Sequence, residues 1–166
     1  MATMVGPLKG LYSMAGYTYF NSITDSVEPS ARLIADAETE LQVLAGELSP
    51  LLWNDPRIRA ALTAVTSKPN PPTIEIVFGP ADRADADALS FLKSLAGDGK
   101  VTLHETDQRQ QGHFMVADRL NVKIEDPHKP NVEARTGYAG CGLARLAQRL
   151  RSRFQLTKQI ATPVVA

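Results

Sequence analysis

The sequence predicts an α/β domain with a mostly parallel sheet flanked by helices and an antiparallel hairpin at residues 113–125. The first observation is that runs rich in β-branched residues alternate with segments whose apolar residues recur every three or four positions. The second is that strands separated by helices are joined by crossovers, which make neighbouring strands parallel. At 166 residues, 43% of them hydrophobic, the chain is long enough to bury one core.

Three parts are expected along the chain: an apolar N-terminal strap at 1–27, the α/β domain at 28–160 and a tail at 161–166. Residues 1–24 mix aromatic and aliphatic side chains with glycines, and Lys9 is their one charged residue. The segment is too apolar for a solvated tail and too rich in glycine for a helix. It packs either over the protein's own core or against a second copy or a partner.

The positions of prolines and the spacing of apolar residues predict the first helices and the first strand. Pro29 fits the first turn of a helix that continues through Glu40, and a buried strand at 41–45 follows. After a loop at 47–54, Asn54 or Asp55 caps a helix with Pro56 in its first turn.

The middle of the chain repeats this alternation. Residues 73–78 form the strongest strand, because β-branched side chains dominate it and prolines precede it. A helix at 82–96 carries its aspartates near the N-terminus, where the helix dipole favours them. A strand at 101–105 follows Gly97-Asp98-Gly99.

The hairpin and a final helix complete the domain. Strict alternation on both sides of Asp118-Arg119 predicts two strands joined by a turn, with His113, Met115 and Ala117 on one face of the first strand. The last helix is expected from Tyr138 or Cys141 to Gln159.

This order resembles one half of the phospholipase D-like fold over roughly residues 28–158. The catalytic motif of that family is His, any residue, Lys, four of any residue, Asp. His113 fits the histidine, but Met115 stands in place of the lysine and Leu120 in place of the aspartate. In active members the histidine attacks phosphorus, the lysine offsets phosphoryl charge and the aspartate orients the imidazole. The resemblance therefore implies a degenerate site, with His113 catalytic only if the protein is an enzyme.

Two charged residues near the motif are not expected to replace the missing ones. Asp118 lies two residues early and, by strand parity, on the opposite face from His113. Lys123 belongs to the next strand, and we expect it to reach the site only if the hairpin twists unusually.

Arg145, Arg149 and Arg153 recur every four residues and form one exposed row on the last helix. No Asp or Glu follows Arg135, although the chain's net charge is zero. The row is either a solvated helix face or a contact for phosphates or an acidic partner. Because the net charge is zero, no global field draws the protein to nucleic acid or membrane.

Other candidate sites are weaker. The side chains that could bind a metal by their chemistry are His104, Glu105, Asp107, His113, Asp118, Glu125, Asp126 and His128. Their spacing matches no known zinc or calcium motif, so no metal and no cofactor are expected. Cys141 is expected to pack as a small residue. The glycine run at 137–142 precedes a helix but lacks the lysine and hydroxyl of a phosphate-binding loop.

The sequence thus predicts a non-catalytic phospholipase D-like module. It would bind a phosphate-bearing ligand, such as nucleic acid or anionic lipid, or a protein partner, through a groove at His113 or the row Arg145, Arg149 and Arg153. Two alternatives stay open: a divergent phosphodiesterase or nuclease using His113 across a dimer, and a structural or protein-interaction subunit using the aromatic N-terminal segment.

The resemblance and the apolar segment at 1–24 also predict a homodimer, because single-copy family members build their site from two chains. The sequence shows neither a signal peptide nor a transmembrane segment, so we expect a cytoplasmic protein.

Overall fold

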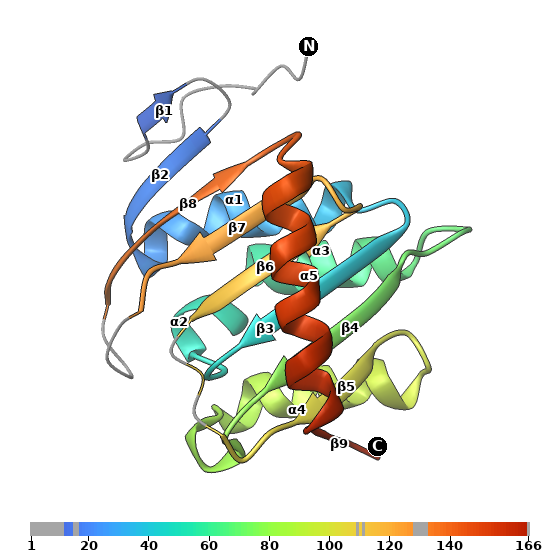
Figure 1. Ribbon diagram of the computed structural model, residues 1–166. Helices are drawn as coiled ribbons and strands as arrows, with labels where there is room; N and C mark the ends of the chain where they lie inside the picture. Colours follow the sequence, from blue (N-terminus) through green and yellow to red (C-terminus); the bar gives the residue numbers. More distant parts are fainter. Residues whose placement is uncertain (1–11, 15–16, 109, 111, 128–132, 166) are drawn as a thin grey trace.

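The computed structural model describes residues 12–14, 17–108, 110, 112–127 and 133–165. They form one nine-stranded sheet with the order β1-β2-β8-β7-β6-β3-β4-β5-β9 (Figure 1). The strands are β1 (Tyr12–Met14), β2 (Tyr17–Ser22), β3 (Glu40–Ala45), β4 (Thr73–Phe78), β5 (Thr102–Glu105), β6 (His113–Ala117), β7 (Asn121–Glu125), β8 (Ala134–Gly140) and β9 (Thr162–Pro163). The helices are α1 (Ile23–Asp36), α2 (Pro50–Trp53), α3 (Pro56–Thr66), α4 (Ala86–Gly97) and α5 (Ala144–Gln159), with a 3-10 turn η1 (Ala81–Arg83).

The α/β class is confirmed, but the prediction of a mostly parallel sheet was wrong. Among the described strands only the pairs β3–β4 and β4–β5 are parallel, and the other six pairs are antiparallel. Helical crossovers join β3 to β4 and β4 to β5, which makes these pairs parallel. Beyond β5 the chain folds as the meander β6-β7-β8, and β2 adds antiparallel to β8. The sequence-based prediction included the antiparallel hairpin β6–β7 but missed β2 and β8, so it missed the rest of the antiparallel half.

The sheet lies between two unequal helical layers. Of the described helices, α1 to α4 cover one face, and α5 crosses the other (Figure 1). Met115 and Ala117 of β6 belong to the larger core beneath α1 to α4, whereas Phe114 and Val116 pack beneath α5. This alternation fixes which side chains of the hairpin share a face.

Helix α1 begins earlier than expected. The side chain of Ser22 caps it by accepting a hydrogen bond from the backbone N–H of Asp25 at 3.0 Å. Pro29, which was expected in the first turn, lies inside the helix. The completely buried Ile23 and Val27 provide contacts that outweigh the local cost of this proline.

The expected start of the last helix at Tyr138 or Cys141 was also wrong, because residues 134–140 form β8 and α5 begins at Ala144. Gly137 explains why a strand fits there. A Cβ atom at this position would lie 2.1 Å from the backbone oxygen of Ile124 and 2.5 Å from Cζ of Phe20. Only a glycine lets β8 approach both neighbours so closely.

Several local predictions are confirmed. Asp55 caps α3 at Pro56, and β4 covers residues 73–78. The hairpin turns at Asp118 and Arg119, whose φ angles are +53° and +62°. The helix expected at 82–96 begins later, at Ala86, because Asp85 caps it after η1.

Candidate functional site

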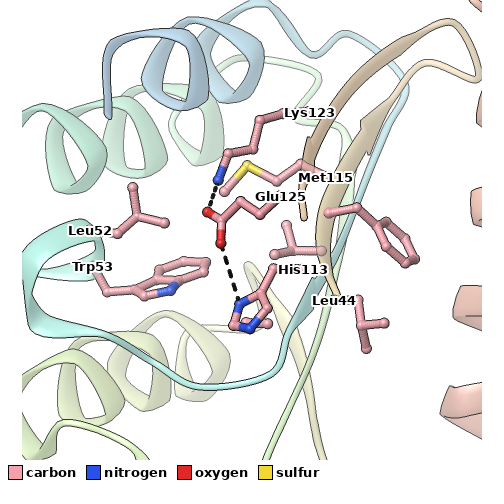
Figure 2. A pocket seen from close by; sticks show the side chains of 10 residues that line it. Leu44, Leu52, Trp53, His113, Met115, Lys123 and Glu125 are labelled. Carbon is pink, nitrogen blue, oxygen red and sulfur yellow. Dashed lines mark hydrogen bonds and ion pairs between the residues drawn. The ribbon is translucent and has the colours of Figure 1, made fainter. Parts of the chain in front are cut away.

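His113 is the first residue of β6 and faces the helical layer α1 to α4. Its exposed fraction is 9%. Directly opposite it on β7 lies Glu125, which is 2% exposed. The imidazole Nδ1 lies 3.8 Å from Oε2 of Glu125, an ion-pair separation (Figure 2). A carboxylate on this side of the ring favours the tautomer that carries its proton on Nδ1.

Glu125 also binds two buried cations. Its Oε1 accepts a hydrogen bond from Nζ of Lys123, and its Oε2 lies 3.4 Å from Nη1 of Arg135. Arg135 in turn donates to Oε1 of Glu47, which follows β3. All four side chains are at least nine-tenths buried. We call these four residues with His113 the Glu125 cluster, in which two carboxylates balance two cations.

Lys123 lies on the next strand, as expected, but the expectation that it reaches the site only through an unusual twist was wrong. In the antiparallel β6–β7 pair, Lys123 lies opposite Met115 and shares its face, with no unusual twist. Its ammonium also lies 5.4 Å from the centre of the Phe20 ring. A cation therefore stands beside the place where the family motif has its lysine, although it comes from the neighbouring strand.

Little room remains at the other nitrogen of His113. A Cβ atom on Gly46 would lie 2.8 Å from Nε2 of His113 and 2.6 Å from the backbone oxygen of Gln110. The adjoining pocket, walled on one side by Leu52 and Trp53 of α2, holds about 10 Å³ of free space (Figure 2). That is close to the minimum volume for one water molecule. Among the described residues, this pocket is too small to enclose a phosphoryl group.

Asp118 has a structural place away from this cluster. Its carboxylate accepts hydrogen bonds from the backbone N–H groups of Glu38, Thr39 and Glu40 at 2.8–3.1 Å. Burial alone would raise the pKa of Asp118, but these hydrogen bonds outweigh it and hold the pKa below its ordinary value. Asp118 therefore ties the hairpin turn to the start of β3.

The arginine row lies on the other side of the sheet. Arg145, Arg149 and Arg153 are exposed on α5, as the sequence predicted. The guanidinium of Arg153 lies 5.8 Å from the ring centre of Phe114, on the face of β6 opposite His113. The sheet thus separates His113 from the row, and the two parts of the predicted site do not form one groove.

The remaining strong cations of α5 point inward and are paired. Nε of Arg151 lies 2.8 Å from Oε1 of Glu40, and Nζ of Lys158 pairs with Oε2 of Glu75. Neither Arg145 nor Arg149 makes an ion pair with any described residue. Helix α5 therefore has one neutralised basic side against the sheet and one open basic side toward solvent.

The other sequence candidates stay apart. The described residues contain no group of three His, Cys, Asp or Glu side chains placed to hold a metal ion. His104 is buried in β5, where burial first and the charge of Lys158 second lower its pKa. His128 lies outside the described residues. The expectation that Cys141 packs as a small residue was wrong, because its side chain is exposed, and the glycine run around it is mostly strand β8.

The sequence-based prediction named Glu125 only as a metal-type side chain and missed Glu47 and Arg135 as parts of this cluster. A hairpin that turns around Arg119 puts residue 125 opposite 113 and residue 123 opposite 115. Counting outward from the turn was therefore enough to find two members. Glu47 and Arg135 carry no such signal, because they come from distant parts of the chain.

Comparisons with known proteins place this fold. No protein-family model matches the chain, and no curated protein sequence matches it. Among solved structures, 92% of the chain superposes on TrmBL2, an archaeal chromatin protein, with a TM-score of 0.64 and 14% identity. The chain spans only 55% of the length of TrmBL2, whose structure is described as showing a novel mode of DNA binding.

Two other neighbours are matched over most of their own length. Nuc from Salmonella typhimurium, a phospholipase D family member, gives a TM-score of 0.62 at 11% identity, with 82% of this chain and 89% of Nuc covered. NucT from Helicobacter pylori gives 0.63 at 8% identity, with 89% and 98% covered. The described part of the chain contains no helix both long and apolar enough to cross a membrane. This chain has the phospholipase D-like fold.

Proposed function

We propose that this protein is a phospholipase D-like module that binds a phosphate-bearing ligand, nucleic acid foremost, without hydrolysing it. The single observation that carries the proposal is the division of cations on α5. Arg151 and Lys158 are paired with sheet carboxylates, whereas Arg145 and Arg149 are exposed and without an ion pair among the described residues. Such a row neutralises phosphates without reading bases.

The geometry of the row suits a backbone of repeating charges. Arg145, Arg149 and Arg153 lie four residues apart, so the row extends along about 12 Å of the helix at ~1.5 Å per residue. No described carboxylate competes for Arg145 or Arg149. Guanidinium groups bind phosphate with paired N–H donors, which favours arginine at such a surface.

The state of His113 supports binding without turnover. Its Nε2, the atom expected to attack phosphorus, faces the chain at Gly46 and Gln110, and the pocket is the size of a water molecule. Both cations of the Glu125 cluster are already paired with carboxylates. They have little charge left to stabilise a phosphoryl transition state.

The spacing of Asp118 gives the same indication. In the family motif the aspartate follows the lysine by five residues, and Asp118 follows His113 by five. In that alignment His113 stands in place of the lysine and Gln111 in place of the histidine. An amide is not a nucleophile for phosphorus, so this alignment lacks the attacking group, and the alignment that keeps His113 as the histidine lacks the lysine and the aspartate.

The structural neighbours fit a phosphate ligand. TrmBL2 is a chromatin protein with a described mode of DNA binding, and a phosphatidylserine synthase from Haemophilus influenzae Rd KW20 also superposes, with a TM-score of 0.53 over 89% of the chain. At 14% and 10% identity these proteins share the fold with this chain. That this chain binds a similar ligand is part of the proposal.

The test is the affinity of the full chain for a short labelled DNA duplex, with vesicles of anionic lipid as a second arm. Arg149→Glu should weaken binding at least about tenfold at low salt, because one attraction becomes a repulsion. Arg83→Glu is the matched control, since Arg83 is exposed on η1, away from α5. Equal loss in both variants, or loss in neither, would contradict the proposal, and binding to vesicles alone would make anionic lipid the ligand.

A second candidate, a divergent phosphodiesterase, is favoured by one observation. Glu125 stands where it can orient His113, and Lys123 supplies a cation beside Met115. If the pocket opens to a substrate, His113 can act as the nucleophile, with the carboxylate of Glu125 to orient it and the ammonium of Lys123 to offset phosphoryl charge. Turnover of a generic phosphodiester that is lost in an equally folded His113→Ala variant would establish this candidate over the first.

A further inference from the structure

In the part of the chain that the structure describes, one region of the sheet has no helix over it on the side of α5. Helix α5 packs on β3, β4, β6 and β7, whereas β2 and β8 lie beyond it and have α1 on their other face (Figure 1). Along β2 the buried Thr18 and Phe20 alternate with Tyr17 and Tyr19. Phe20 faces Lys123 and the layer of α1, so Tyr17 and Tyr19 face the side of α5.

Tyr138 of β8 completes a group of three rings. It lies directly opposite Tyr19 in the β2–β8 pair, and its neighbour on β7 is Ile124, which packs in the core beneath α5. The centres of the rings are 5.7 Å apart for Tyr17 and Tyr138, 6.1 Å for Tyr19 and Tyr138, and 6.3 Å for Tyr17 and Tyr19. We call these three residues the tyrosine platform.

The platform is accessible and is not part of either core. Tyr19 is 41% exposed, and Tyr17 and Tyr138 are half-buried. None of the three belongs to the two clusters of buried apolar residues. Within the described residues no helix covers this face, and three aromatic rings held together there form the kind of exposed apolar patch that marks a binding site.

The arginine row begins beside this platform. Strand β8 ends at Gly140, opposite Tyr17, and α5 begins at Ala144 on the same side of the sheet. Arg145 is therefore at the end of the helix nearest the platform, and Arg149 and Arg153 follow along it. The chain places flat aromatic rings and unpaired cations next to one another on one surface.

This combination matches the chemistry of unpaired nucleotides. A single strand exposes both its phosphates and the faces of its bases, and bases stack on aromatic side chains whatever their identity. A duplex hides the base faces inside its stack, and a lipid headgroup has none. Building on the proposed function, we propose that the ligand is single-stranded nucleic acid, with phosphates on the arginine row and bases stacked on the tyrosine platform.

The test uses labelled single strands of about twelve nucleotides, within the usual site size for such surfaces, in DNA and RNA forms, and the matching duplex. The full chain should bind the single strands more tightly than the duplex. Tyr19→Leu should weaken single-strand binding roughly 5- to 100-fold, as the loss of one stacked base does, and leave duplex binding unchanged. Tyr19→Phe keeps the ring and should bind like the wild type. Comparing the affinities for the DNA and RNA strands decides which of the two nucleic acids is the ligand.

The outcomes separate this inference from the proposed function. If Arg149→Glu weakens binding of every nucleic acid while Tyr19→Leu changes none, the platform is not a base-binding surface and the arginine row still stands. If neither substitution matters, both proposals fall. A Tyr19→Leu variant that melts like the wild type, binds normally and loses a dimeric mass would show that a second copy covers the platform, which overturns the inference.

Discussion

Glu125 lies opposite His113 in the β6–β7 hairpin, with Oε2 3.8 Å from the imidazole Nδ1 and with Lys123 and Arg135 on the same carboxylate. Its burial makes this carboxylate the hub of a network that joins β6, β7 and β8 to the end of β3. The network explains how charged side chains can be buried in the core, because each charge has a partner of opposite sign that offsets its desolvation cost.

Loss of the Glu125 charge should therefore be costly. We predict that Glu125→Gln lowers the free energy of unfolding by about 3–5 kcal/mol, because it leaves Lys123 as a buried cation without its partner. Chemical denaturation measures the change. Asp126→Asn is the control, since Asp126 is the exposed next residue and bonds only Thr136 among the described residues. The double variant with Lys123→Met should recover part of the loss, and a loss below about 1 kcal/mol in Glu125→Gln would argue against the network.

Gly137 should resist even a small side chain. In Gly137→Ala the new Cβ would meet the backbone oxygen of Ile124 at 2.1 Å, so the β7–β8 pair must shift, at a cost of about 1–3 kcal/mol or more. Gly112→Ala is the matched control, because the atoms nearest to its Cβ would be those at the flexible end of Arg153, at 3.1 Å and beyond. Thermal melting compares them, and equal melting temperatures would show that β8 does not lie this close to its neighbours.

The carboxylate of Asp118 should make stability depend on pH. Its folded-state pKa lies below the unfolded value, so its contribution is complete above the unfolded pKa of about 3.9 and is lost as the pH falls through the folded pKa. Asp118→Asn keeps the turn geometry but should cost about 1–2 kcal/mol at neutral pH. The difference from wild type should shrink below about pH 4.

Denaturation curves across this pH range test the prediction for Asp118. Asp82→Asn in η1, where the carboxylate is exposed, serves as the control and should show no such difference. A cost for Asp118→Asn that persists unchanged in acid would mean that the charge is not what stabilises the turn.

A homodimer remains a prediction from the resemblance and from the apolar first residues. Light scattering at micromolar concentration should give twice the mass of one 18.0 kDa chain. The variant to test lacks only residues 1–11, because a longer deletion would remove β2 at 17–22 or α1 at 23–36 and disturb the fold. Removal of the first eleven residues should weaken association, and a wild-type mass of one chain would contradict the dimer.

The parts of the fold that local sequence determines were predictable. Asp55-Pro56 marks the start of α3, and the alternation around Asp118-Arg119 marks the hairpin, because caps, turns and periods are local signals. Strand β8 was missed because its glycines and tyrosine resemble a loop, and it becomes a strand through its pairing with β7 and with β2, which is distant in sequence and was not predicted. The cluster partners Glu47 and Arg135 were missed for the same reason, since tertiary contacts alone join them.

The central claim is that phosphates bind to the outward arginines of α5. The slope of the logarithm of the association constant against the logarithm of salt concentration, measured with a short DNA duplex, tests it most directly. Arg149→Ala should reduce the magnitude of this slope by about one, because one fewer phosphate is neutralised, and Arg83→Ala should leave it unchanged. An unchanged slope in Arg149→Ala, or binding by the wild type that does not respond to salt, would contradict the account.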